Sequence, residues 1–149
     1  MINQKIISTQ PNLDKRILAG LIDYGIVFSF GGILSYFFGV SKEVGEIHLE
    51  GLPAFALIFF WFIFIVLSEY ISGNTLGNYL QKLKVVSIQE SKKDINFGQA
   101  LKRHLVDMLD VWLFLGIILI KNTKYNQRLG DLWAKTIVID KTDPKQGIV

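Results

Sequence analysis

The fold is decided by the stretch that opens the first apolar run, Lys15-Arg16-Ile17-Leu18-Ala19-Gly20-Leu21-Ile22-Asp23-Tyr24. Arg16 and Asp23 are seven residues apart, close to two helical turns, so they share one face of the expected helix. At a rise of ~1.5 Å per residue, Asp23 lies about 10 Å further along that helix. A carboxylate in hydrocarbon costs ~2.5–3.5 kcal/mol on insertion scales, which indicates that Asp23 has a partner, a water-filled cavity or a task.

The composition of the 149-residue chain is typical of a membrane protein. Half of its residues are hydrophobic, its mean hydropathy is +0.36, and its net charge is +3 with a pI near 9.1. The cations do not form a dense basic patch, which argues against nucleic acid as a partner. The chain has no cysteine, no histidine–cysteine cluster, no Gly-x-Ser-x-Gly and no phosphate loop, so we expect no enzymatic activity, no resident metal and no cofactor.

Two uncharged runs are long enough to cross a membrane. Tyr24–Ser41 and Gly51–Ser68 each contain 18 residues without a charge. A third run, Val111–Ile120, has only 10 and follows Asp107 and Asp110, and a run of this length is more typical of a re-entrant or interfacial segment. The sequence therefore predicts an all-α membrane protein with two full transmembrane helices and a third, re-entrant or tilted apolar helix.

The segments between the apolar runs differ in net charge. Residues 1–16 carry +2, residues 72–103 carry +4 and residues 121–149 carry +3, whereas residues 40–51 carry −2. The positive-inside rule places the three basic segments in the cytoplasm, including the N-terminus. Two full spans satisfy this arrangement. A full third span, which would leave the basic tail outside, stays open as an alternative because the rule is statistical.

Two runs rich in β-branched residues, Leu80–Ile88 and Thr136–Asp140, predict strands. We expect them to pair into a small cytoplasmic antiparallel β element. The domain prediction is a single membrane domain over residues 1–140 and a polar tail over residues 141–149. Lysines around the first strand are expected to contact anionic lipid headgroups: Lys82, Lys84, Lys92 and Lys93.

Three motifs occur in order around these runs: Arg16-x-x-Ala19-x-x-Ile22-Asp23, Gly73-x-Thr75-Leu76-Gly77, and Arg128-Leu129-x-Asp131-x-x-Ala134-x-Thr136-x-Val138. Over roughly Leu13–Asp140 the chain resembles the RDD family of small bacterial integral membrane proteins. That family is named for one arginine and two aspartates, which fall here on Arg16, Asp23 and Asp131. The chain departs from the family pattern at Asn78 and Gln81, where lysine and glycine are common, which puts in doubt a basic anchor role for that loop.

The resemblance implies a multi-pass protein of the bacterial cytoplasmic (inner) membrane, with an undefined activity for which sodium/proton antiport-like transport has been suggested. An ion or proton site would then form from Arg16, Asp23 and Asp131, with sodium or a proton as the cation. Two or three helices hardly enclose a path, so we expect a homo-oligomer, with the small residues Gly31, Ser35 and Gly39 as its seam. The secondary candidates for the site are the other charges near the ends of the apolar runs: Glu69, Arg103, Asp107, Asp110 and Arg128.

The alternative is a non-transporting membrane scaffold or accessory protein in which the same charges are structural. Arg16 with Asp131, or Arg128 with Asp23, would then be buried pairs that dock the C-terminal segment onto the first helix. His104 is expected at the interface, with a proton relay as its alternative role. The sequence leaves transport and structural docking open, and they are not exclusive.

Overall fold

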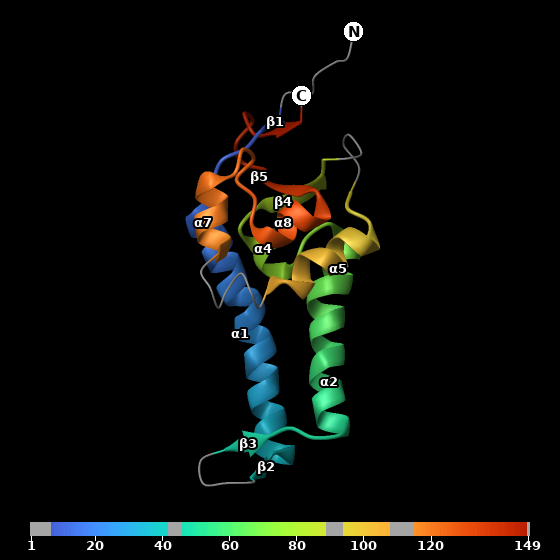
Figure 1. The fold of residues 1–149 in the computed structure, drawn as a ribbon. Coiled ribbons are helices and arrows are strands. Elements are labelled where there is room, and N and C mark those ends of the chain that lie inside the picture. Colours follow the sequence, from blue (N-terminus) through green and yellow to red (C-terminus); the bar gives the residue numbers. More distant parts are fainter. Residues whose placement is uncertain (1–6, 42–45, 89–93, 108–114, 149) are drawn as a thin grey trace.

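Two long apolar helices run side by side, and the other elements form a cap at one end of the pair, apart from a short hairpin at the other (Figure 1). The computed structural model describes residues 7–41, 46–88, 94–107 and 115–148. The first long helix, α1, covers Leu13–Phe38 and has 26 residues. At ~1.5 Å per residue it is about 39 Å long, more than the ~30 Å of a bilayer core.

The second long helix is continuous from Leu52 to Ser72 and has 21 residues. It consists of α2 (Leu52–Trp61), a π-helical stretch η1 (Phe62–Leu67) and α3 (Ser68–Ser72). It ends at Gly73, whose φ of 73° lies in the left-handed region that favours glycine. Both long helices are apolar and long enough to span a membrane, so this part of the predicted fold is confirmed.

The two long helices contact each other through small and aromatic residues. A Cβ added at Gly31 would lie 3.4 Å from the methyl carbons of Leu57, and the rings of Phe30 and Phe60 stack with their centroids 4.2 Å apart. A short hairpin, β2 (Val40–Ser41) with β3 (Ile47–His48), lies between them at the end remote from the cap. Gly31 therefore packs within the chain, and the homo-oligomer stays a prediction.

The cap contains the predicted sheet. Strands β4 (Leu83–Ser87) and β5 (Thr136–Asp140) pair antiparallel with Leu83 opposite Asp140 and Ser87 opposite Thr136, so the predicted pairing is confirmed. Its cytoplasmic location stays a prediction. A core cluster lies beneath it, from the first helix to the sheet, and includes Ala19, Val66, Leu83, Val85, Ile95, Ala100 and Val138.

Four short helices complete the described part of the cap: α4 (Leu76–Leu80), α5 (Phe97–Leu105), α7 (Leu115–Asn122) and α8 (Leu129–Ala134). Helix α7 contains the second half of the third apolar run, and eight residues are too few to cross a bilayer. Residues 108–114, with Asp110, lie outside the described residues. The third, re-entrant helix therefore stays a prediction.

Two glycines allow the cap helices to touch their neighbours. A Cβ at Gly77 of α4 would lie 2.1 Å from the carbonyl oxygen of Ala19, and one at Gly130 of α8 would lie 2.4 Å from that of Arg103. Both distances are shorter than any real Cβ contact, so only glycine lets α4 meet α1 and α8 meet α5 in this way. These approaches set the positions of the buried charges described below.

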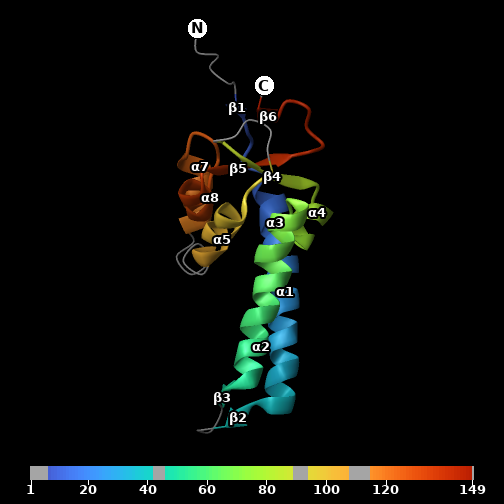
Figure 2. The same ribbon diagram turned by 90° about the vertical axis from the view of Figure 1, so that its right-hand side faces the viewer.

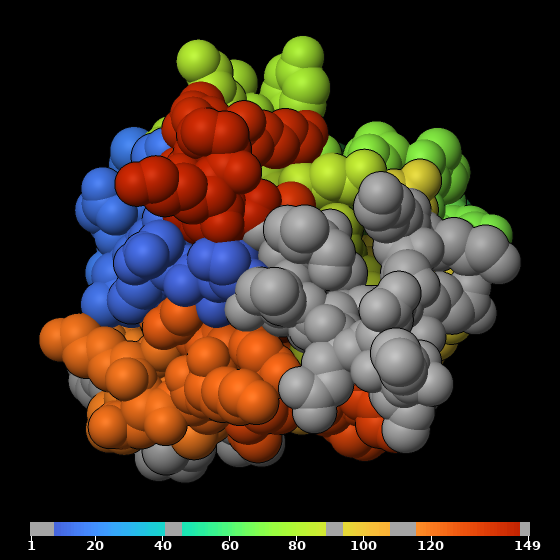
Figure 3. All heavy atoms as spheres, turned by 90° about the horizontal axis from the view of Figure 1, so that it is seen from above, coloured from blue at the N-terminus to red at the C-terminus, as the bar shows by residue number. Residues whose placement is uncertain are grey.

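The two ends of the chain meet above the cap (Figure 2). Strands β1 (Ile7–Ser8) and β6 (Gly147–Ile148) pair antiparallel. Seen from above, the N-terminal and C-terminal segments lie next to each other, and the segment that carries α7 lies against the N-terminal one (Figure 3). The side chain of Asn126 donates a hydrogen bond to Thr9 Oγ1 at 2.9 Å, which ties these segments together.

Candidate functional site: a cluster of buried charges

The cap encloses charged side chains from both long helices and from the C-terminal half of the chain. They form one connected set, which we call the charge cluster: Arg16, Glu69, Arg103, His104, Asp107, Arg128 and Asp131. Arg16 comes from α1, Glu69 from α3, and Arg103 and His104 from α5. Asp107 follows α5, Arg128 precedes α8, and Asp131 lies in α8. Segments remote in sequence thus converge on one buried site.

Arg103 is the centre of the cluster and only 1% exposed. Its Nε and Nη2 donate to the two carboxylate oxygens of Glu69 at 3.0 and 3.2 Å, a bidentate pair. Its Nη1 donates to Asp131 and, at 3.0 Å, to Thr136 Oγ1. Burial alone would lower the pKa of Arg103, but the carboxylates of Asp131 and Glu69 outweigh burial and raise it. The guanidinium therefore ties α3, α8 and β5 to α5.

Asp131 is fully buried and accepts hydrogen bonds from several donors. Besides Arg103, its carboxylate accepts from Arg16 Nη1 at 3.3 Å and from the backbone N–H of Arg128 at 3.1 Å. Burial would raise the pKa of Asp131, but Arg103, Arg128 and Arg16 together hold it below its ordinary value. Asp131 is therefore ionised, and its carboxylate holds the first long helix through the hydrogen bond from Arg16.

His104 lies between two carboxylates and is buried, not at the exposed surface expected for an interfacial residue. Its Nε2 is 2.9 Å from Glu69 Oε2 and its Nδ1 is 2.6 Å from Asp107 Oδ2. Burial disfavours the charged ring, but the carboxylates of Glu69 and Asp107 outweigh this and raise the pKa of His104 to about 9. The imidazole is therefore protonated at neutral pH and bridges both acids.

Asp107 closes the other end of the cluster. Its Oδ1 is 2.7 Å from Arg128 Nη1, and its Oδ2 accepts a hydrogen bond from the hydroxyl of Tyr24 at 2.5 Å. Burial would raise the pKa of Asp107, but Arg128 and His104 keep it well below its usual range. A continuous series of contacts therefore runs from Tyr24 through Asp107, His104 and Glu69 to Arg103.

Asp23 lies apart from the residues with which we expected it to form a site. It is buried, and its Oδ1 accepts a hydrogen bond from the backbone N–H of Gly77 at 2.7 Å, where α4 crosses α1. In the described part of the chain Asp23 forms no ion pair with Arg16 or Arg128, whereas Arg16 does pair with Asp131. The structure thus divides the predicted set: Arg16 and Asp131 meet, and Asp23 holds a helix crossing.

The buried guanidinium of Arg16 uses only part of its hydrogen-bonding capacity among the described residues. Its side chain is 9% exposed, and within the described residues neither Nε nor Nη2 has a hydrogen-bond partner. Buried donors are nearly always satisfied in proteins, so these two nitrogens mark a place where the cluster can accept one more oxygen atom. An anionic or carbonyl oxygen is the group that would fit there.

The sequence did not indicate every residue of this site. Tyr24, Thr136, Gly77 and Gly130 contact it, and nothing in a single sequence distinguishes such residues from ordinary packing positions. The secondary candidates Glu69, Arg103, Asp107 and Arg128 were found by a simple signal, a charge beside an apolar run, and all four lie in the cluster. Asp110 lies outside the described residues.

The chemistry available to the cluster is proton exchange. An imidazole that touches a carboxylate through each ring nitrogen can take a proton from one side and release it on the other. Among the residues that the structure describes, no group of three or more His, Cys, Asp or Glu side chains is arranged to hold a metal ion. The acids are instead neutralised by guanidinium and imidazolium groups.

Comparison with known proteins identifies a family. The sequence model of the RDD family matches residues 10–135, which is most of the chain and includes the charge cluster. No curated protein and no solved structure matches the chain.

Proposed function

Since the chain belongs to the RDD family and has two helices long enough to cross a membrane, we propose that it is a multi-pass protein of the bacterial cytoplasmic membrane that exchanges protons in ion or small-solute transport. The observation that carries this proposal is the direct contact of His104 with Glu69 and Asp107. The proposal includes no enzymatic activity. It places the N-terminus in the cytoplasm because the N-terminal segment is basic and the positive-inside rule assigns basic segments to the cytoplasmic side.

Coupling to a cation follows from the charges around the imidazole. His104 keeps its proton at neutral pH because two carboxylates surround it. A second cation bound nearby repels the protonated ring, which lowers the pKa of His104 and releases the proton. Binding of sodium and binding of the proton would thus exclude each other, which is the requirement for antiport. The proton is the better supported of the two ions, because the acids of the charge cluster are already paired with cations.

Asp23 is the candidate for the second ion. Its Oδ1 accepts a hydrogen bond from the backbone N–H of Gly77 in α4, which follows the break in the chain at Gly73, where the second long helix ends. A hard cation needs several oxygen ligands, and carbonyl groups freed at a broken helix supply them in other membrane proteins. We place the cation at Asp23 and the exchangeable proton at His104.

Transport by this chain would need more than one copy, because two long helices do not enclose a path. Gly31 already packs on Leu57 and Gly39 lies against Ile47, so a homo-oligomer would use other parts of the helix surface as well as Ser35. Anionic lipid remains the proposed partner of the exposed lysines at the sheet, Lys82 among them.

The proposal is tested with His104→Gln in proteoliposomes that carry a sodium gradient and an internal pH dye. We expect proton exchange to be lost while the protein still folds, because Arg103 and Arg128 still pair with Glu69 and Asp107. His48→Gln is the matched control: His48 is exposed, 3.1 Å from Glu46, and far from the cluster. Exchange that is unchanged in His104→Gln would overturn the proposal.

The pH dependence of stability provides a second readout. The pKa of His104 in the folded protein, about 9, is above the ordinary value of 6.5. Its contribution to stability is therefore complete below pH 6.5 and is lost as the pH rises through about 9. We expect the melting temperature in detergent to fall over that window, and the fall to be smaller in His104→Gln but not in His48→Gln.

A second candidate function, a non-transporting scaffold, is favoured by the way Asp131 is held. This carboxylate is fully buried and contacts Arg103, Arg16 and Arg128, which is what a structural clasp between the two halves of the chain requires. Arg16→Gln and Asp23→Asn separate the candidates when folding in detergent and ion flux are both measured. Normal folding with lost flux supports transport, and lost folding supports the clasp.

A further inference from the structure

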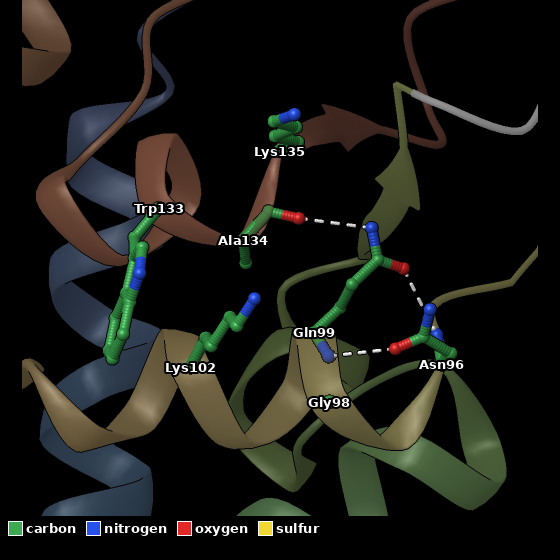
Figure 4. Close-up of a pocket in the computed structure, with 7 residues that line it drawn as sticks. All are labelled: Asn96, Gly98, Gln99, Lys102, Trp133, Ala134 and Lys135. Atoms are coloured by element: carbon green, nitrogen blue, oxygen red, sulfur yellow. Dashed lines mark hydrogen bonds between the residues drawn. The ribbon is translucent and has the colours of Figure 1, made fainter.

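A small hollow lies on the side of the cap, between α5 and the end of α8, outside the charge cluster (Figure 4). Its volume is about 190 Å³, and Lys102, Trp133 and Lys135 are among the residues that line it. The described residues that line it include two lysines and no acid. We propose that this hollow binds the phosphate group of an anionic membrane lipid. The inference rests on the membrane placement proposed above, but not on proton exchange.

The wall of the hollow is rigid and has its own hydrogen bonds satisfied. Asn96 and Gln99 form a capping box at the start of α5, with reciprocal hydrogen bonds of 2.9 and 3.1 Å. Gln99 also donates to Ser87 Oγ at 2.9 Å and to the carbonyl of Ala134 at 3.0 Å. Figure 4 shows the side chains of Asn96 and Gln99 turned toward one another, to the right of Lys102 and below Lys135. Gln99 is thus bonded within the protein, and the cationic donors in the hollow are the ammonium groups of Lys102 and Lys135.

The two lysines have no anionic partner in the part of the chain that the structure describes. Lys102 Nζ lies 5.9 Å from the centre of the Trp133 ring, a cation–π contact, and both lysines are exposed. Other lysines of the cap do have such partners, since Lys15 pairs with Asp140 and Lys84 with Asp94. Two unpaired cations around one hollow are complementary to a phosphate, which carries the opposite charge and several acceptor oxygens.

The backbone at Lys135 makes a lysine-to-glycine change a useful variant for the test. Lys135 has a φ of 54° at the C-terminus of α8, in the left-handed region that favours glycine or asparagine. A lysine there costs backbone energy that a glycine would not. The position thus carries a long cationic side chain against its local conformational preference.

The position of the hollow, close to the end of the second long helix, indicates that the phosphate belongs to a lipid. Helix α5 packs beside the end of the second long helix, with the ring of Phe97 6.1 Å from that of Phe62 and 5.7 Å from that of Tyr70. This is where a membrane span ends and the headgroup layer begins. Trp133, which lines the hollow, is 50% exposed, and the same two helices carry the exposed apolar side chains of Leu105 and Leu132. Tryptophan beside lysine is typical of the membrane interface, where the ring lies among the acyl chains and the ammonium reaches the headgroups.

The test reconstitutes the full chain into vesicles that contain either brominated phosphatidylglycerol or brominated phosphatidylcholine, at equal bromine content. The chain has two other tryptophans, Trp61 and Trp112, so both are replaced by phenylalanine in every protein tested, and this background serves as the wild type. Bromine quenches nearby tryptophan fluorescence, so the difference between the two vesicles then reports a headgroup preference near Trp133. We expect stronger quenching by phosphatidylglycerol in the wild type. The difference should be lost in Lys102→Gln, in Lys135→Gly and, because the reporter is gone, in Trp133→Phe.

Lys121→Gln is the matched control for Lys102→Gln, because Lys121 is another exposed lysine on a helix of the cap and it does not line the hollow. It makes the same chemical change, and the quenching difference should persist. Melting in detergent checks folding, and Lys135→Gly should be at least as stable as the wild type. If Lys135→Gly does not fold, Lys102→Gln decides the test.

Three results would overturn the proposal. Equal quenching by the two lipids in the wild type would show no headgroup preference at this place. An equal loss in Lys121→Gln would show that general surface charge attracts the lipid. Removal of the preference by millimolar inorganic phosphate would show a site for a soluble anion rather than for a lipid. None of these results would affect proton exchange at His104, so the two proposals fail separately.

Discussion

The long helices and the cap distribute polarity in opposite ways. On the helices, large apolar side chains face outward, with Phe28 74% and Phe55 71% exposed. In the cap, Arg103 is 1% exposed, and Glu69 and Asp131 are fully buried. The first arrangement suits a lipid environment, because a soluble protein rarely exposes so large an apolar surface. The second arrangement is stable only if every charge has a partner, because desolvation of an unpaired charge costs several kcal/mol.

The comparison teaches where specificity lies in this fold. An apolar helix surface accepts many substitutions, since lipid adapts to the shape of a side chain. The charge cluster accepts few, because each guanidinium serves more than one acid, as Arg103 does for Glu69 and Asp131. The cap should therefore determine whether the chain folds correctly, and the long helices should determine only where it resides.

The largest effect is expected for Arg103→Gln. Loss of the guanidinium leaves Glu69 and Asp131 buried without their main partner, so the free energy of unfolding should fall by ~3–5 kcal/mol. Denaturant unfolding in detergent measures it. Lys102→Gln, at the exposed neighbouring position on α5, is the control and should change stability by less than ~0.5 kcal/mol. Equal effects in the two variants would remove the contrast between the buried and exposed charges.

An intermediate effect, with opposite signs in the two regions, is expected for glycine to alanine changes. Gly130→Ala should destabilise by about 1–3 kcal/mol or more, because the new Cβ would lie 2.4 Å from the carbonyl oxygen of Arg103. Gly20→Ala in α1 meets nothing within 4 Å and should be neutral or stabilising by up to ~1 kcal/mol. Melting temperatures of both variants check this, and a stable Gly130→Ala would show that α8 is free to move away from α5.

The smallest effect is expected for Lys84→Ala, which removes an exposed ion pair of the cap. Lys84 Nζ lies 3.0 Å from Asp94 Oδ1, but the two side chains are 37% and 70% exposed. Such pairs contribute less than about 1 kcal/mol, and salt screens them. The change in stability should be within that limit at low salt and vanish at high salt. A loss as large as that of Arg103→Gln would mean that burial does not control the strength of ion pairs in this cap.

Much of the fold could be predicted from the sequence, because its strongest signals are local. The uncharged runs Tyr24–Ser41 and Gly51–Ser68 predict the two long helices, and the β-branched run Thr136–Asp140 predicts β5. The pairing of β4 with β5 also followed, since these are the two β-type runs that the sequence shows on one side of the expected membrane. Length and composition alone carry these predictions.

The site was predicted only in part, because partners depend on crossings that a sequence does not show. Arg16 was expected to act with both Asp23 and Asp131, and it meets only Asp131 among the described contacts. The reason is Gly77, which lets α4 approach α1 so closely that the backbone N–H of Gly77 donates a hydrogen bond to the carboxylate of Asp23. His104 was expected at the interface, but α8 packs on α5 through Gly130 and covers the cluster.

The pairing of strands has a topological consequence for the chain between them. Strands β4 and β5 flank the third apolar run and are joined over five residues, from Leu83 opposite Asp140 to Ser87 opposite Thr136. Two strands that share hydrogen bonds must lie in the same compartment, so the polypeptide that leaves Ser87 comes back to Thr136 on the side from which it departed. Likewise, β1 pairs with β6, so Ile7–Ser8 and Gly147–Ile148 would lie on one side of a membrane that the chain spans, and the polypeptide between them would cross it an even number of times.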